Sequence, residues 1–105
     1  MIEHSNTFKS KIYLLAKQIP RGKVATYGQL AQMAGSPRAA RAVGMCMKQN
    51  PDSNTMPCHR VVASDGKLTG YAFGGINSKK QILLEEGVQF IGDRVNLTLS
   101  QWHPD

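Results

Sequence analysis

The fold of this chain is constrained most by Gly35-Ser36-Pro37, which separates two segments of helical character. Gly35 favours the end of a helix over 27–33, because glycine readily adopts the left-handed conformation that closes a helix. Ser36 and Pro37 are typical of the N-cap and first turn of a new helix, which we predict over 38–49. Two helices joined in this way form a helix-turn-helix whose second helix meets DNA, although an ordinary helical corner has the same pattern.

Small residues surround Arg41 in the second of these helices. Few long side chains project from this part of the helix, because its other residues include Ala39, Ala40, Ala42 and Gly44. Such a helix can approach a groove closely, but it lacks the several Arg, Asn and Gln side chains that usually read base edges. We therefore predict DNA contact without strong sequence specificity.

The remaining elements are expected to be short. Residues 1–5 form a loose leader, and a first helix, capped by Asn6 or Thr7, runs to about Gln18. The other expectations are a strand at 61–62 paired with 67–68, a last helix that starts at Asn77 or Ser78 and ends near Glu86, and an exposed Trp102. The predicted fold class is mainly α with a few short strands, a winged-helix-like helix-turn-helix DNA-binding domain over 1–105.

Composition limits the partners of the protein. The 105 residues suffice for one compact domain, and the formal net charge is +6. Residues 1–60 hold nine Lys and Arg against two acids, whereas residues 61–105 hold four against five. A basic half of this kind favours a polyanion, most simply nucleic acid, and a merely solubilising basic surface is the alternative.

Cysteine and histidine usage excludes several classes of protein. Cys46 and Cys58 form no CxxC pair, and the three histidines show no metal-ligand spacing, so we expect neither a disulfide framework nor a metal. The sequence has no apolar run long enough to span a bilayer and no signal-like N-terminus. We expect a cytoplasmic protein, or a nuclear one in a eukaryote, with no membrane contact.

Chemical function is concentrated in the segment 56–62, where Cys58 stands between Pro57 and His59 and is followed by Arg60. Proline stiffens the approach to the cysteine, and a neighbouring His or Arg favours the thiolate, which is the nucleophilic form. The alternative is a buried, inert core cysteine, because free cysteines are commonly buried.

Several segments in order resemble the C-terminal domain of the O6-alkylguanine-DNA alkyltransferases, the methylated-DNA–protein-cysteine methyltransferases. They lie at 26–31, 40–44, 50–51, 57–61, 70–71 and 84–87. The resemblance implies direct reversal of DNA damage: an O6-alkylguanine is flipped out of double-stranded DNA and its alkyl group moves irreversibly to a cysteine. It further implies a monomer that needs no cofactor, since the damaged base is itself the alkyl donor.

By the same resemblance Cys58 would be the nucleophile. His59 would be its base, acting through a water, and Glu86 would orient His59. Asn50 would brace the active-site turn, and Tyr27 would donate a hydrogen bond to the departing purine. Each has a plainer alternative: a packed aromatic for Tyr27, a solvated helix end for Glu86, and a helix stop for Asn50.

The resemblance also implies a minor-groove position for the helix-turn-helix, with Arg41 entering the stack in place of the flipped nucleotide. A simple phosphate contact is the alternative for Arg41. The other DNA contacts would be Tyr27, Ser36, Arg38, Ala39, Ala40 and Gly44. The walls of the alkylguanine pocket would be Met47, Val61, Tyr71, Ala72 and Phe73.

Departures from the family pattern leave two other functions open. Family members usually have an N-terminal domain that this chain is expected to lack, and Ala72 stands where many have a serine. The length also resembles alkyltransferase-like proteins, which bind the lesion without repairing it and carry tryptophan or alanine at the nucleophile. Cys58 favours the enzyme over such a sensor. A winged-helix regulator with a structural Cys58 is the third hypothesis.

Overall fold

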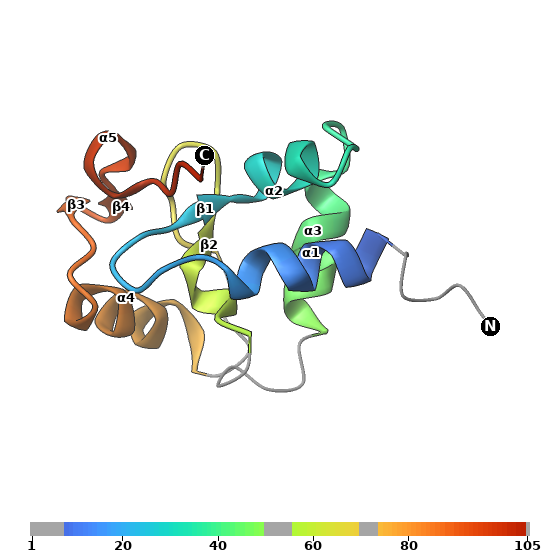
Figure 1. The fold of residues 1–105 in the computed structure, drawn as a ribbon. Coiled ribbons are helices and arrows are strands. Elements are labelled where there is room, and N and C mark those ends of the chain that lie inside the picture. Colours follow the sequence, from blue (N-terminus) through green and yellow to red (C-terminus); the bar gives the residue numbers. More distant parts are fainter. Residues whose placement is uncertain (1–7, 50–55, 70–73, 105) are drawn as a thin grey trace.

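A computed structural model describes residues 8–49, 56–69 and 74–104 (Figure 1). In the view of Figure 1 three helices gather on the right, and they are α1 (Phe8–Lys17), α2 (Tyr27–Met33) and α3 (Ala40–Lys48). Strands β1 (Ala25–Thr26) and β2 (Val61–Val62) lie at the centre. The other side holds α4 (Gly75–Glu85), β3 (Phe90–Ile91), β4 (Arg94–Val95) and α5 (Leu97–Ser100). The mainly helical fold with few short strands agrees with the predicted class.

Helix α1 forms where the apolar periodicity predicts it. Ile12, Ala16 and the following Ile19 are fully or almost fully buried on one face, and α1 packs against both α2 and α3. The caps expected at Asn6 or Thr7 lie outside the described residues. The first helix is therefore a core element and presents its lysines outward.

The turn between α2 and α3 confirms one prediction and corrects another. Gly35 has a φ of +87°, and the amides of Gly35 and Ser36 donate to the carbonyls of Gln32 and Ala31 at 3.0 and 2.9 Å, which closes α2 as expected. Ser36 does not cap the next helix, because the N-cap position lies three residues later. Helix α3 starts at Ala40 instead of residue 38, and its N-cap, Ala39, has no side-chain cap.

Strand β2 pairs with β1 instead of with 67–68, so the expected strand pairing is wrong. The two strands are parallel, with Ala25 opposite Val61 and Thr26 opposite Val62. The chain does turn back after β2, where the Ala63 amide donates to the Lys67 carbonyl at 3.0 Å, but Lys67 forms its bridge with Arg94. Val61 and Val62 are both 0% exposed, which is the burial of a core strand and not of an outer wing.

Helix α4 begins before the predicted caps Asn77 and Ser78. Gly74, at a φ of +136°, occupies the N-cap position, so the chain enters the helix through a glycine conformation and not through a side-chain cap. The helix ends at Glu85, as expected, and buries Lys79 and Leu83 on its inner face.

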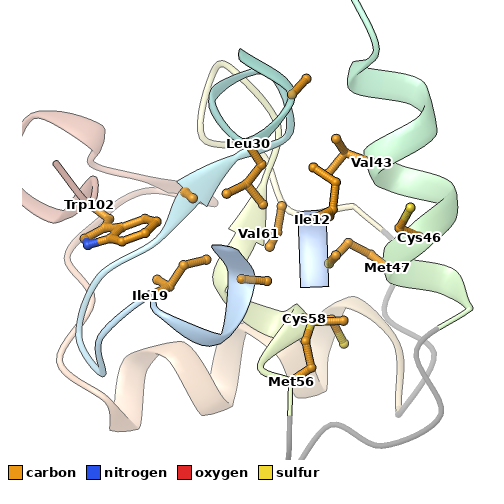
Figure 2. Packing of buried hydrophobic residues seen from close by; sticks show 13 residues of the cluster. Ile12, Ile19, Leu30, Val43, Cys46, Met47, Met56, Cys58, Val61 and Trp102 are labelled. Carbon is orange, nitrogen blue, oxygen red and sulfur yellow. The ribbon is translucent and has the colours of Figure 1, made fainter. Parts of the chain in front are cut away.

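Trp102 is buried, which corrects the expectation of an exposed residue (Figure 2). The tail runs beside the chain before β1: Val24 donates to the Ser100 carbonyl at 2.9 Å, and the Trp102 amide donates to the Val24 carbonyl at 2.7 Å. The Gln29 side chain donates to the Trp102 carbonyl at 2.6 Å. This pairing holds the indole in the main core, which also contains Ile19 and Leu30.

The core consists of two hydrophobic clusters. The larger joins α1, α2 and α3 to Met56, Cys58, Val61 and Trp102. The smaller contains Val24, Val62, Leu83, Val88 and Val95. Among the described residues no helix has the length and apolar character needed to cross a membrane.

Candidate active site

Cys58 is the first residue of a 3₁₀ helix, η2 (Cys58–Arg60), that leads directly into β2. Its amide donates to the Met56 carbonyl at 2.8 Å, and the residue is 5% exposed. Cys58 also lines a cavity of about 960 Å³ together with Tyr27, Met47, Thr69 and Lys79. The thiol therefore combines core packing with access to a space large enough for a purine.

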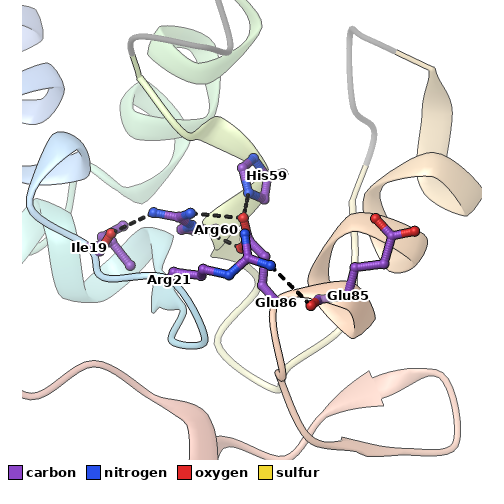
Figure 3. A network of polar contacts seen from close by, with 6 residues as sticks. All are labelled: Ile19, Arg21, His59, Arg60, Glu85 and Glu86. Atoms are coloured by element: carbon purple, nitrogen blue, oxygen red, sulfur yellow. Dashed lines mark hydrogen bonds and ion pairs between the residues drawn. The ribbon is translucent and has the colours of Figure 1, made fainter.

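One carboxylate joins the end of α4 to η2 (Figure 3). Glu86 Oε2 accepts from His59 Nε2 at 3.0 Å and from Arg60 Nη2 at 2.8 Å, while Glu86 Oε1 accepts from Arg60 Nε at 2.9 Å. Arg60 also donates through Nη1 to the Ile19 carbonyl at 2.9 Å. The network therefore brings together His59 and Glu86, as predicted, and adds Arg60.

Burial and neighbouring polar groups act in opposite directions on the pKa of His59 and on that of Glu86. Burial lowers the pKa of His59 from its ordinary value, and the Glu86 carboxylate opposes this effect only in part. Burial acting alone would raise the pKa of Glu86, but hydrogen bonds from Arg60 and His59 bring it below its ordinary value. At neutral pH the pair is thus a neutral imidazole beside a carboxylate, which is the arrangement a general base needs.

Tyr27 reaches the same cavity from the first turn of α2. Thr26 holds this turn by a capping box, in which its hydroxyl accepts from the Gln29 amide at 3.0 Å and its amide donates to Gln29 Oε1 at 3.2 Å. The Tyr27 hydroxyl forms a short hydrogen bond with Thr69 Oγ1. Burial raises the pKa of Tyr27, and the Thr69 contact opposes that rise, so the phenol stays protonated.

Lys79 is a buried amine that sequence reasoning missed. The residue is 1% exposed, and its Nζ donates to the Val61 carbonyl at 2.7 Å. Burial lowers the pKa of Lys79 to about 8. The missed signal was helical spacing, since Lys79 shares a face with Ile82 and Leu83. No comparable pattern in the sequence indicated the contact between Thr69 and Tyr27.

The cavity opens along α3, where Ala40, Arg41, Gly44 and Lys48 contribute to its lining. Arg41 is exposed, as are Pro37 and Arg38, whereas Ser36 and Ala39 are part-buried. Of the predicted pocket walls, Met47 lines the cavity, whereas Val61 does not: it is 0% exposed in the core, and its carbonyl accepts from Lys79. The predicted site residues Asn50, Tyr71, Ala72 and Phe73 lie outside the described residues.

Metal chemistry has no ligand set in this part of the chain. In residues 8–49, 56–69 and 74–104, no group of three or more His, Cys, Asp or Glu side chains could hold an ion. The arrangement that does occur is a cavity lined by the Cys58 thiol and the Tyr27 phenol, with the hydrogen-bonded His59 imidazole and Glu86 carboxylate next to Cys58 in the chain and at the end of α4. This combination is suited to nucleophilic transfer to sulfur.

Residues 7–88 match the family described as 6-O-methylguanine DNA methyltransferase, DNA binding domain, and the chain belongs to this family. It is 44% identical over 80 residues to a methylated-DNA–protein-cysteine methyltransferase of Methanosarcina acetivorans, which covers 76% of this chain and 51% of the relative. It is 39% identical over 105 residues to the DNA base-flipping protein of Escherichia coli, covering 97% of this chain and 79% of that protein.

A solved structure with a similar fold is that of S. pombe Atl1 in complex with damaged DNA containing O6-carboxymethylguanine. It has a TM-score of 0.78 and 35% identity, covering 99% of this chain and 100% of Atl1. The chain spans about half the length of the methyltransferase relatives that it matches. The family thus includes relatives named for transfer and a relative named for base flipping.

Proposed function

We propose that this protein repairs double-stranded DNA by moving the alkyl group of an O6-alkylguanine to Cys58. The single observation that supports this most is the position of Cys58, which lines the cavity and is followed in η2 by His59, the residue that contacts Glu86. A regulator with a structural cysteine would need neither the cavity nor the paired base.

The chemistry is a substitution at the alkyl carbon. His59 takes the Cys58 proton through a water, and Glu86 holds the imidazole in the tautomer that can accept it. The sulfur attacks, the new S–C bond forms, and the C–O6 bond breaks with its electron pair left on the purine. Tyr27 hydrogen-bonds the purine as negative charge develops, and the purine ends by taking up one proton. The thioether is stable, so each molecule acts once.

DNA is the partner that best fits the outer surface. The small residues of α3 line the cavity mouth, and Arg41 stands exposed beside them. We propose that α3 enters the minor groove and that Arg41 fills the space left by the flipped nucleotide. The S. pombe neighbour, which was solved with damaged DNA, supports DNA as the partner.

A second candidate function is lesion sensing without transfer. It is favoured by the relatives that align over almost the whole chain, the E. coli base-flipping protein and S. pombe Atl1. In this case the same cavity would hold the flipped base while Cys58 stays unmodified, and other machinery would complete the repair.

Intact-protein mass spectrometry separates the two functions. After mixing with a duplex that carries one O6-methylguanine, we expect the mass of one methyl group to be added, on the peptide that contains Cys58. Cys58→Ala should add nothing yet bind the lesion with nearly wild-type affinity, because the thiol makes few DNA contacts. Cys46→Ala is the matched control and should still be methylated.

Two outcomes would contradict alkyl transfer. Tight, lesion-selective binding without any gain in mass would establish the sensor. Equal affinity for plain and O6-methylguanine duplexes, combined with a strong preference for one DNA sequence, would establish the regulator.

A further inference from the structure

The hydrogen bond between Tyr27 and Thr69 lies inside the candidate site. The two residues are 42 positions apart in the sequence, and both line the cavity that contains Cys58. Tyr27 is at the start of α2, whereas Thr69 follows the turn after β2. The contact therefore joins the first turn of α2 to the segment that follows β2.

The hydrogen bond between the Tyr27 and Thr69 hydroxyls can run in either direction. Each hydroxyl has one proton and can accept as well as donate, and in this contact either oxygen can be the donor. If Tyr27 directs its proton toward a base in the cavity, its oxygen is left to accept from Thr69. A hydroxyl that accepts one hydrogen bond becomes a better donor in the next, because the two bonds polarise each other.

We propose that Thr69 is a positioning residue for alkyl transfer, which fixes the Tyr27 hydroxyl and donates to its oxygen while Tyr27 hydrogen-bonds the departing purine. The inference rests on the proposed function. When the C–O6 bond breaks, its electron pair remains on the purine and draws the Tyr27 proton toward the base. The charge that builds on the Tyr27 oxygen is then stabilised by the Thr69 proton, which stays on Thr69.

The electrostatics of Tyr27 are consistent with this role. Burial raises the pKa of Tyr27, and the hydrogen bond from Thr69 is the main effect that opposes the rise. Removing the Thr69 hydroxyl would leave the phenol a weaker acid and a less well-oriented donor. The contribution is that of one neutral hydrogen bond, which corresponds to a change in rate of about fivefold.

The test compares Thr69→Val, which removes the hydroxyl at nearly constant volume, with Thr69→Ser, which keeps it. We expect methyl transfer to Cys58 to slow about fivefold in Thr69→Val and to be largely restored in Thr69→Ser. Thr98→Val, at an exposed position on α5, is the matched control and should transfer at the wild-type rate. In a Tyr27→Phe background, Thr69→Val should cause no further slowing, because the two residues act through one bond.

A second readout does not depend on DNA. With carbon-13 at the ring carbon that bears the tyrosine hydroxyl, NMR follows the titration of each tyrosine, and Tyr27→Phe assigns the Tyr27 signal. We expect Thr69→Val to raise the pKa of Tyr27 and Thr69→Ser to leave it near the wild-type value.

Two results would overturn the inference while the proposed function stands. They are a wild-type transfer rate in Thr69→Val, or equal slowing by Thr69→Val with and without the Tyr27 hydroxyl. A wild-type protein that gains no methyl group would instead overturn the proposed function itself.

Discussion

Glu86 links two other polar side chains of the site, because its carboxylate accepts from both His59 and Arg60. Arg60 uses the rest of its guanidinium on the Ile19 carbonyl. The sequence suggested that Arg60 would favour the thiolate of its neighbour Cys58. Its contacts instead show an arginine that holds the orienting carboxylate in place, and that ties the site to the segment after α1.

Lys79 should make the stability of the protein depend on alkaline pH. Its pKa falls from 10.5 to about 8 on folding. Between these values the unfolded chain binds more protons, so the free energy of unfolding rises with pH, by about 3 kcal/mol in total for this group. In urea unfolding across this range, wild type should gain stability relative to Lys79→Met, because the opposing effect of the raised pKa values of Tyr27 and Cys46 is common to both proteins.

Lys80→Met is the matched control for this titration. Lys80 pairs with the exposed Asp93 at 3.1 Å, and its own side chain is one third exposed. The alkaline rise should persist in this variant. If Lys79→Met kept the rise as well, the buried amine would not be its source.

Arg41→Ala should slow repair of duplex DNA much more than repair of a single strand. The exposed guanidinium is proposed to fill the gap left by the flipped nucleotide, and a single strand has no stack to fill. Because unstacking costs a few kcal/mol, we expect roughly a tenfold larger effect on the duplex. Methyl transfer rates on both substrates provide the measurement, and equal slowing would leave Arg41 as a simple phosphate contact.

Helix α3 places small residues along the lining of the cavity. Gly44 lies in the middle of this helix and lines the cavity, and a Cβ at this position would meet no heavy atom within 4 Å. Gly44→Ala should therefore raise the free energy of unfolding by about 1 kcal/mol through helix propensity. The same methyl should weaken binding to lesion duplex, since it stands on the surface proposed to approach the groove.

Gly35→Ala, in the turn of the same helix-turn-helix, is a control that should change stability in the opposite direction. A Cβ there meets no neighbour either, but the φ of +87° is strained for alanine, so stability should fall by about 1 kcal/mol. Urea unfolding and fluorescence anisotropy with labelled duplex measure the two properties separately. A stabilised Gly44→Ala that binds as tightly as wild type would contradict close approach by α3.

The elements also show where sequence reasoning succeeds. α1, α2 and the closure at Gly35 follow from periodicity and capping, which are local, and they were predicted. Whether Ser36 ends α2 or starts α3 was not decidable locally, because serine suits both positions and the choice depends on which backbone groups it meets. The pairing of β2 with β1 was missed for a similar reason, since Val61 and Val62 are compatible with either partner.

At the scale of the whole molecule, the C-terminal segment is part of the fold. Trp102 belongs to the main core although it follows the end of the family match at residue 88. Trp102→Ala should lower the free energy of unfolding by about 3 to 4 kcal/mol, measured by circular dichroism in urea. Leu99→Ala, at an exposed tail position, should change it by less than about 0.5 kcal/mol.

A Trp102→Ala variant as stable as wild type would show that the tail adds nothing to the fold.

Sequence reasoning missed this docking because the tail has no clear periodicity and its partner, Val24, lies far away in the sequence. The same limit applies to the site. Cys58, His59, Glu86 and Tyr27 were predicted through the family resemblance. The burial of Lys79 had a local signal in its helical spacing, whereas the contacts of Thr69 and Arg60 required the three-dimensional arrangement.

The two hydrophobic clusters have a consequence for the dynamics of the protein. Cys58 belongs to the larger cluster, whereas Glu86 follows α4, whose Leu83 lies in the smaller cluster and whose Ile82 packs against the larger one. Proteins open locally in cooperative units that follow such packing. An opening of the smaller cluster would therefore withdraw the carboxylate only if Ile82 also left the larger one. Amide exchange in α4 would report how often both contacts are lost together.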